Sequence, residues 1–298
     1  MLTNPNTTAA PVRWSAEEMV KREVQLISLP EIYFRARQTL EDPNNGMAEL
    51  AEVITQDPAL TARVLKLANS GLYRFSAPIT TVRQAVTLLG TTEVSQLITV
   101  TCITRAFSGI SNSSMNMDLF WQNSIYCASL SKLFGELQKK GGAEGVFVAG
   151  LLHDIGHLIM YQLAPAECAE VMQAAAHEER ALDELEQEIV GCHYADIGGV
   201  LLANWKLPAY LCEPVRSHLH PSPEAPYAVE TAIVHLAARL SRSTATGSPF
   251  REEEFFAEEW IWELTRLSPA LCGSKLFEAE KLSQEVLGLI FPGHGQLT

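Results

Sequence analysis

Apolar residues recur along this chain at intervals of three and four, and no stretch of strand length alternates between apolar and polar residues. Such spacing is typical of amphipathic helices, whereas a half-buried strand would alternate. The pattern therefore predicts an all-α fold with short connections between packed neighbouring helices. The predicted helices cover residues 15–28, 31–41, 47–55, 58–68, 79–89, 92–103, 119–137, 144–162, 165–176, 182–191, 193–206, 209–218, 227–241, 252–266 and 275–289.

Local signals mark where several of these helices begin or end. Ser15 and Glu18 have the spacing of a capping box, which satisfies free N–H groups at a helix start. Asp57 followed by Pro58 is typical of an N-cap with proline at the first helical position. Gly90 stands where a helix C-cap is expected. These signals predict helix ends near residues 15, 57 and 90.

A serine- and asparagine-rich stretch at 109–116 interrupts the helical pattern and indicates a boundary between subdomains. We predict a flexible tail over 1–14, an N-terminal helical subdomain over 15–110 and a second helical subdomain over 117–241. A C-terminal helical extension over 248–298 is expected to pack on the second subdomain. The prediction is thus a multi-helix bundle of two helical subdomains.

The predicted helix over 144–162 carries a histidine and an aspartate side by side within an apolar run, at His153 and Asp154. The run is too long for one buried strand, so it is interpreted as one buried helix. A charge inside such a helix is costly unless it is paired or bound to a metal. Adjacent helical side chains point about 100° apart, so the pair could reach one ion only where other helices supply further ligands.

Composition narrows the range of functions. The chain has 298 residues, enough for one large domain or two modest ones, and 47% of them are hydrophobic, enough for a sizeable core. The formal net charge of −13 repels phosphate backbones and disfavours a general nucleic-acid binder. This net charge is compatible with a small local pocket that binds a nucleotide-type ligand.

Six cysteines are scattered without a CxxC pair, which indicates a reducing compartment, free thiols and no structural zinc knuckle. No basic-then-apolar signal peptide opens the sequence. No uninterrupted apolar run reaches 18 residues, so no membrane span is predicted. We expect a cytoplasmic protein.

Several segments agree, in order, with one known family. Between Leu29 and about Pro221 the chain resembles the HDOD domain, a branch of the HD metal-dependent phosphohydrolase superfamily. The segments that carry the resemblance are Leu29-Pro30, residues 57–61 (DPALT), residues 67–70 (LANS), Ile79 to Gly90, Phe120-Trp121, Phe147 to Gly156, His193 with Ile197-Gly198, Trp205 to Pro208, and His218. The resemblance implies an all-helical fold and a role in signalling.

The resemblance also implies where catalytic HD enzymes place their metal ligands. Four ligand-type residues remain at those positions: His153, Asp154, His193 and His218. Other residues stand at the remaining positions: Asn123 for the first histidine, Leu219 for the second of a downstream pair, and Ala238 for the final aspartate. A set of nitrogen and oxygen ligands suits Fe, Mn, Ni or Zn, so the sequence suggests a reduced metal site or, alternatively, a satisfied polar cluster at a helix junction.

The cleft around these positions has three candidate lining residues, Asn123, His157 and His235. His235 lies three residues before Ala238, on roughly the same helix face, where it could replace the missing ligand. His157 takes the place where many HD enzymes carry a lysine after the HD pair. An unperturbed histidine is mostly neutral at pH 7, so it would meet a phosphate less strongly than lysine does.

Three functions stay open at this point. The first is a regulatory signalling module without catalytic activity, whose partners are signalling proteins or a second copy of this chain in a homo-oligomer. The second is a metal-dependent phosphohydrolase, acting on a nucleotide or cyclic dinucleotide with the reduced ligand set. The third is a small-ligand sensor that uses the former active-site cleft.

Overall fold

The computed structural model describes residues 13–23, 28–107, 115–138, 145–178, 180–245 and 249–291. Within these ranges the regular structure is entirely helical, which confirms the predicted all-α class. The helices are α1 (Ala16–Glu23), α2 (Glu31–Glu41), α3 (Met47–Thr55), α4 (Pro58–Ala68), α5 (Val82–Phe107), α6 (Met117–Glu136), α7 (Val146–Leu152), α8 (Ile155–Leu163), α9 (Pro165–His177), α10 (Leu182–Ile189), α11 (Tyr194–Asn204), α12 (Ala209–Ser217), α13 (Ala228–Ala245), the 3₁₀ helix η1 (Glu252–Glu254), α14 (Glu259–Thr265), α15 (Pro269–Ser274) and α16 (Leu276–Ile290).

Helix ends that carry a local signal lie where the sequence predicted them. The Ser15 N–H donates to Glu18 Oε2 at 3.0 Å, and the Glu18 N–H donates to Ser15 Oγ at 3.2 Å, so the capping box is complete. Asp57 caps α4 by accepting from two backbone N–H groups. Gly90 interrupts α5 with φ 84° and ψ 168°, a backbone conformation that glycine adopts without steric cost.

Two predicted elements after residue 240 differ from the structure. The polar loop expected from residue 241 begins later, because α13 continues to Ala245. In its last turns the Ser241 hydroxyl donates to the Ala238 carbonyl at 3.0 Å, a local bond that is compatible with a continuing helix. The single helix expected over 252–266 is divided into η1 and α14, because Phe255 leaves the helical path to bury its ring in the second core cluster.

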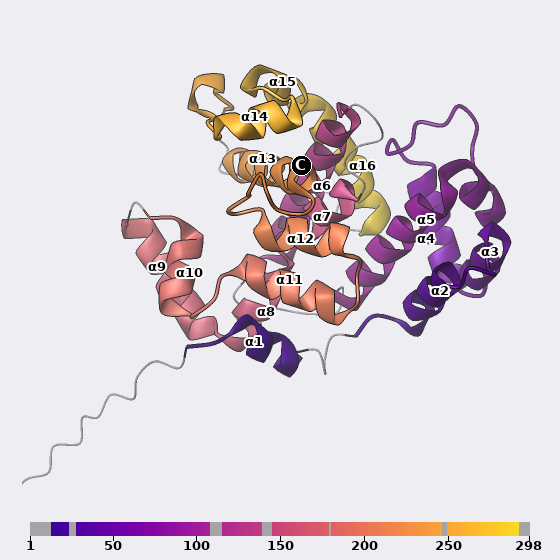
Figure 1. Ribbon diagram of the computed structural model, residues 1–298, viewed down its shortest axis with the longest axis horizontal. Helices are drawn as coiled ribbons and strands as arrows, with labels where there is room; N and C mark the ends of the chain where they lie inside the picture. The colour runs from indigo at the N-terminus through magenta and orange to yellow at the C-terminus, as the bar shows by residue number, and fades with distance from the viewer. Residues whose placement is uncertain are drawn as a thin grey trace, which may run out of the picture.

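The helices form two groups that share one core cluster (Figure 1). On one side α2, α3 and α4 pack against α5; in the centre α6 packs against α7, α13 and α16, and α11 packs against α8 and α12. A second core cluster lies between α6, α13 and the segment that carries α14 and α15. The subdomain boundaries near residues 110 and 248 stay a prediction, since those residues lie outside the described ranges.

Two helices pack far from their neighbours in sequence. α1 lies against α8 and α11, away from the α2–α5 group that follows it in the chain. α16 lies against α6 and also contacts α4, so it joins the central helices to the N-terminal group. The Gly71 N–H donates to Glu285 Oε1 at 2.9 Å, which adds a polar contact between α16 and the turn after α4.

Two segments, Val82–Phe107 and Val146–Leu163, are long and apolar enough to cross a membrane by length and composition alone. Buried residues make up 56% of the apolar window in the first and 78% in the second. Since core helices of globular proteins pass the same test, the burial of both segments identifies them as core helices here.

Glycines set how closely the helices around the HD pair approach. A Cβ atom added at Gly156 on α8 would lie 1.9 Å from the Tyr194 carbonyl oxygen on α11, so only glycine fits this contact. At Gly199 on α11 an added Cβ would lie 2.6 Å from Cβ of Arg216 on α12. These contacts bring α8, α11 and α12 close together.

Candidate functional site

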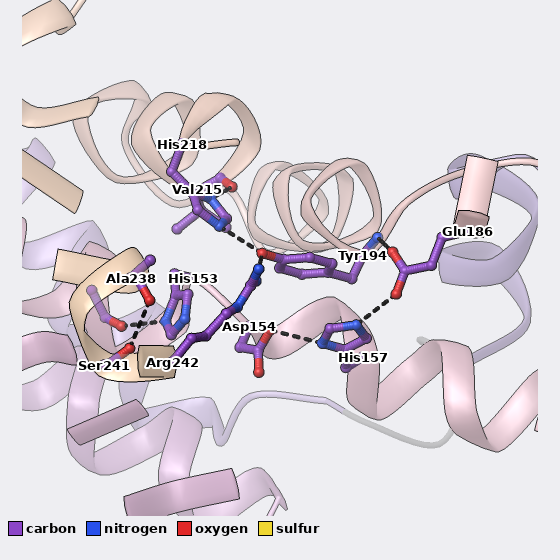
Figure 2. A network of polar contacts seen from close by, with 11 residues as sticks. His153, Asp154, His157, Glu186, Tyr194, Val215, His218, Ala238, Ser241 and Arg242 are labelled. Atoms are coloured by element: carbon purple, nitrogen blue, oxygen red, sulfur yellow. Dashed lines mark hydrogen bonds and ion pairs between the residues drawn. The ribbon is translucent and has the colours of Figure 1, made fainter. Parts of the chain in front are cut away.

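The HD pair lies at a break between two helices. α7 ends at Leu152, and α8 begins at Ile155, so the prediction of one continuous helix over 144–162 was wrong. Asp154, with φ −104° and ψ 4°, leaves the helical conformation, and the His153 ring donates from Nδ1 to the Gly150 carbonyl at 2.8 Å. The break turns both side chains toward the junction of α7, α8, α11, α12 and α13 (Figure 2).

Two buried histidines face each other at this junction. His153 and His218 are at most 1% exposed, and their rings meet edge to face with centroids 5.4 Å apart. Each ring donates from Nδ1 to a backbone carbonyl at 2.8 Å, Gly150 for His153 and Val215 for His218. Burial lowers the pKa of both histidines. Each is therefore a neutral imidazole with its lone pair on Nε2.

The two Nε2 atoms have different surroundings. His218 Nε2 lies 3.0 Å from the Tyr194 hydroxyl, which donates to it. The same hydroxyl accepts a hydrogen bond from the guanidinium of Arg242, a residue on α13. His153 Nε2 is buried and has no hydrogen-bond partner. The junction thus holds one engaged and one free imidazole nitrogen.

His157 forms the centre of a second buried cluster. Its Nδ1 donates to Asp154 Oδ1 at 2.7 Å, and its Nε2 donates to Glu186 Oε1 at 2.7 Å. Burial alone would lower the pKa of His157, but the two carboxylates outweigh it and raise the pKa to about 10. Burial likewise acts to raise the pKa of Asp154, yet His157 holds that pKa well below its usual range. His157 is therefore an imidazolium at pH 7, because its environment shifts it away from the mostly neutral state expected of an unperturbed histidine.

Tyr194 links the two clusters. Its ring stacks on His157 with centroids 4.1 Å apart and planes 18° apart. Its N–H donates to Glu186 Oε2 at 3.0 Å, while its hydroxyl bonds His218 and Arg242. Figure 2 shows this continuous chain of contacts from Glu186 to His218.

The side chains of the other candidates take no part in the contacts that link His153, His218, Tyr194 and His157. His193 caps α11: its Nδ1 accepts from the Asp196 N–H at 3.2 Å, and its Nε2 lies 3.2 Å from Asp196 Oδ2. His235 donates from Nδ1 to the backbone carbonyl of His218 at 2.7 Å. Asn123 lies on α6 with a buried side-chain oxygen that has no hydrogen-bond partner. Ala238 is buried on α13, one turn before Arg242.

This arrangement does not fit a metal ion. Across the described part of the chain, no group of three or more His, Cys, Asp or Glu residues is placed to hold one. His218 Nε2 and Asp154 Oδ1 already accept hydrogen bonds from the protein, and His193 is used as a helix cap. His153 Nε2 is the one free imidazole nitrogen at the junction. The geometry supports a buried, charge-paired polar network that joins six helices, because Glu186 brings in α10 beside α7, α8, α11, α12 and α13.

Sequence reasoning missed three members of this network: Glu186, Tyr194 and Arg242. Glu186 stands in an acidic stretch of its helix, beside Glu184 and Glu188, and yet it is only 2% exposed. Tyr194 directly follows His193, and Arg242 lies one helical turn beyond Ala238, so both stand next to positions that the family resemblance had marked. Their roles depend on contacts between distant parts of the chain, which a pattern within one helix does not contain.

A cavity of about 610 Å³ lies elsewhere, between α5, the C-terminal half of α6 and the start of α7. Its lining includes Gln96, whose side-chain nitrogen is buried without a hydrogen-bond partner, and Lys132, whose ammonium lies over the Tyr73 ring. Glu93 and Glu136 also line it. The histidine, aspartate and asparagine candidates are all absent from its lining, so this cavity is separate from the HD junction.

Comparison with known proteins agrees with the family resemblance. The sequence profile of the HDOD domain matches residues 26–221. Among solved structures, the chain is similar to a candidate phosphohydrolase from Shewanella amazonensis SB2B, with 23% identity, a TM-score of 0.69, and coverage of 90% of this chain and 98% of that one. An HDOD domain protein of unknown function from Geobacter sulfurreducens is 25% identical with a TM-score of 0.68, over 91% of this chain and 98% of that one.

Two further relatives are longer than this chain. A candidate signal transduction protein from Marinobacter aquaeolei VT8 is 22% identical with a TM-score of 0.67, over 95% of this chain and 61% of that one. An uncharacterized protein from Treponema pallidum (strain Nichols) is 21% identical over 212 residues, which is 71% of this chain. This chain spans 40% of that relative's length.

Proposed function

Because this chain belongs to the HDOD domain family, we propose that it is a regulatory protein that passes a signal by contact with partner proteins and hydrolyses no phosphoester. The observation that carries the proposal is the engagement of His218 Nε2 and Asp154 Oδ1 by Tyr194 and His157. The similarity of fold to a candidate signal transduction protein supports it. The partners we propose are signalling proteins or a second copy of this chain.

Metal-dependent hydrolysis of a phosphoester needs a bound metal ion with one open coordination position. A water molecule bound there loses a proton more easily. At the HD junction the protein's own donors occupy His218 Nε2 and Asp154 Oδ1, and Arg242 already supplies a positive charge there. These residues connect α7, α8, α10, α11, α12 and α13 through hydrogen bonds and ring contacts. A rigid junction of this kind suits a module that transmits a signal through its surface.

Purified protein is expected to show no turnover of bis(p-nitrophenyl) phosphate, mononucleotides or cyclic dinucleotides with Mn²⁺, Ni²⁺, Fe²⁺ or Zn²⁺. The measurement is product release compared with that of the metal salt alone and of the His153→Ala variant. The wild type and the variant should give the same background rate. Turnover that disappears in His153→Ala would instead establish the alternative function, a metal-dependent phosphohydrolase with a reduced ligand set.

A second candidate function is the sensing of a small ligand. The cavity beside α5 favours it, although this cavity is separate from the former active-site cleft for which the sequence suggested that function. Its volume of about 610 Å³ lies within the range of ligand pockets, which often form at subdomain interfaces. The unpartnered amide nitrogen of Gln96 can donate to a ligand carbonyl, and Phe147 supplies an apolar wall. Glu93 and Glu136 oppose a highly charged phosphate chain, so a nucleobase, nucleoside or monophosphate fits better than a triphosphate.

If this cavity binds such a ligand, one member of a panel of nucleobases, nucleosides and nucleotides should raise the melting temperature. At a hundredfold excess over Kd the stabilisation is about 2.7 kcal/mol, which corresponds to a rise on the order of 5–10 °C. Gln96→Leu should abolish the rise, whereas Gln173→Leu, at an exposed position on α9, should preserve it. A flat response across the panel, or equal responses in both variants, would remove this candidate.

A further inference from the structure

We propose that the guanidinium of Arg242 takes the place of a metal ion at the HD junction, and that its removal would convert the junction into a site for a divalent transition-metal ion. The inference concerns the same junction as the proposed function and rests on the misfit between the present residues and a metal. The two can fail separately, because metal uptake and phosphoester hydrolysis are measured independently.

The first observation is the position of Arg242. It extends from α13 to the Tyr194 hydroxyl, and in Figure 2 His153 and Asp154 lie on either side of it. Its guanidinium lies over the Tyr194 ring, 5.3 Å from the ring centroid. A partly buried cation is thus held among residues that resemble the ligand set of HD enzymes.

The second observation is the balance of charge. The junction contains two carboxylates, Asp154 and Glu186, and the guanidinium of Arg242. The negative charges of both carboxylates favour the charged form of the Arg242 guanidinium. Of the two, Asp154 belongs to the HD pair. Buried charges are tolerated when they are paired. Without Arg242, the positive charge that lies among His153, Asp154 and Tyr194 would be absent from the junction.

The third observation is a set of atoms beside Arg242 and Tyr194 that could bind a metal ion. His153 Nε2 carries a buried lone pair without a partner. His218 Nε2 carries a lone pair that is bound by the Tyr194 hydroxyl. Together with the Asp154 carboxylate these atoms would supply two nitrogen ligands and one oxygen ligand, the number of protein ligands found in catalytic zinc sites. A side-chain rotation at Asp154 would complete the set, since its Oδ1 now faces His157.

The test uses the Tyr194→Phe/Arg242→Ala double variant, which removes the cation and releases His218 Nε2 while it keeps the aromatic ring on His157. Equilibrium dialysis against Zn²⁺ or Co²⁺, followed by elemental analysis, should find about one ion per chain, as expected of a single site. The wild type should take up far less under the same conditions. Adding His153→Ala to the double variant should weaken the affinity at least about tenfold, because a ligand is lost.

Arg239→Ala is the matched control. Arg239 lies on the same helix, but its guanidinium is directed to the Phe256 carbonyl and the Phe255 ring, outside the junction. Removing this charge should leave metal uptake at the wild-type level. Equal uptake in Arg239→Ala and in the double variant would show that any loss of positive charge promotes binding, and this would overturn the proposal.

Folding is checked by far-UV circular dichroism before dialysis. If the double variant does not fold, Arg242→Ala alone removes the positive charge and should show an intermediate uptake, because Tyr194 still binds His218 Nε2. Arg242→Lys should show none because it keeps the positive charge. A folded double variant that takes up no metal would overturn the proposal. So would a wild type that binds one ion as tightly as the double variant does.

Discussion

Replacing His157 with alanine should lower the free energy of unfolding by about 3–5 kcal/mol at pH 7, the usual cost of breaking a buried ion pair by removing one partner. In the wild type the imidazolium lies between Asp154 and Glu186, at 2.7 Å from each. Without it the two buried carboxylates would face each other with no charge between them. The melting temperature should fall on the order of 10 °C in thermal denaturation.

The pH dependence of this loss identifies its cause. The pKa of His157 is near 6.5 in the unfolded chain and is raised to about 10 in the folded protein. The folded state therefore binds the proton more tightly, and this stabilisation is complete below pH 6.5 and is lost as the pH rises through about 10. The difference in stability between wild type and His157→Ala should accordingly shrink from pH 7 to pH 10.

His177→Ala provides the control for this prediction, because His177 is an exposed histidine on α9. Its replacement should change the stability by no more than about 0.5 kcal/mol. If His157→Ala and His177→Ala were equally stable, or if the loss for His157→Ala did not change with pH, the charged cluster around His157 would not stabilise the fold as described.

Replacing Gly156 with alanine should also destabilise the protein strongly. The added methyl group would lie 1.9 Å from the Tyr194 carbonyl oxygen and 2.9 Å from the Gly198 nitrogen. Both are backbone atoms, so the clash can be relieved only by moving α11 away from α8. We expect a loss of about 3 kcal/mol or more, at the upper end of the cost of overpacking. Chemical denaturation monitored by circular dichroism measures it.

Gly288→Ala is the corresponding control. Gly288 lies inside α16, and a Cβ atom added there would meet nothing within 4 Å. Alanine should stabilise this helix by about 0.5–1 kcal/mol, since glycine is the poorer helix former. Equal changes in stability for Gly156→Ala and Gly288→Ala would contradict the close contact between α8 and α11.

The parts of the fold that follow from local chemistry could be predicted from the sequence. Asp57 caps α4, and Gly90 interrupts α5, because each residue acts on atoms within a few positions of itself. The break between α7 and α8 could not be predicted in this way. It accompanies the contact of Gly156 with the Tyr194 backbone, and these residues are far apart in the sequence.

The same distinction applies to the candidate site. The resemblance to the HDOD family marked His153, Asp154 and His218, and the structure places all of them at one junction. It could not reveal that Arg242 would bond the Tyr194 hydroxyl, because that contact joins two helices. It also could not show that Asp154 and Glu186 together would keep a proton on His157. Charge pairing between distant residues depends on the assembled fold.

The position of α1 has a consequence for how the chain folds during synthesis. α1 buries Met19 and Val20 completely, and it lies against α8 and α11, which the ribosome produces much later. Domains generally begin to fold as the chain emerges. The apolar face of α1 therefore lacks its final packing partners until α11 has left the ribosomal exit tunnel. Its docking is therefore a late event in the folding of the chain.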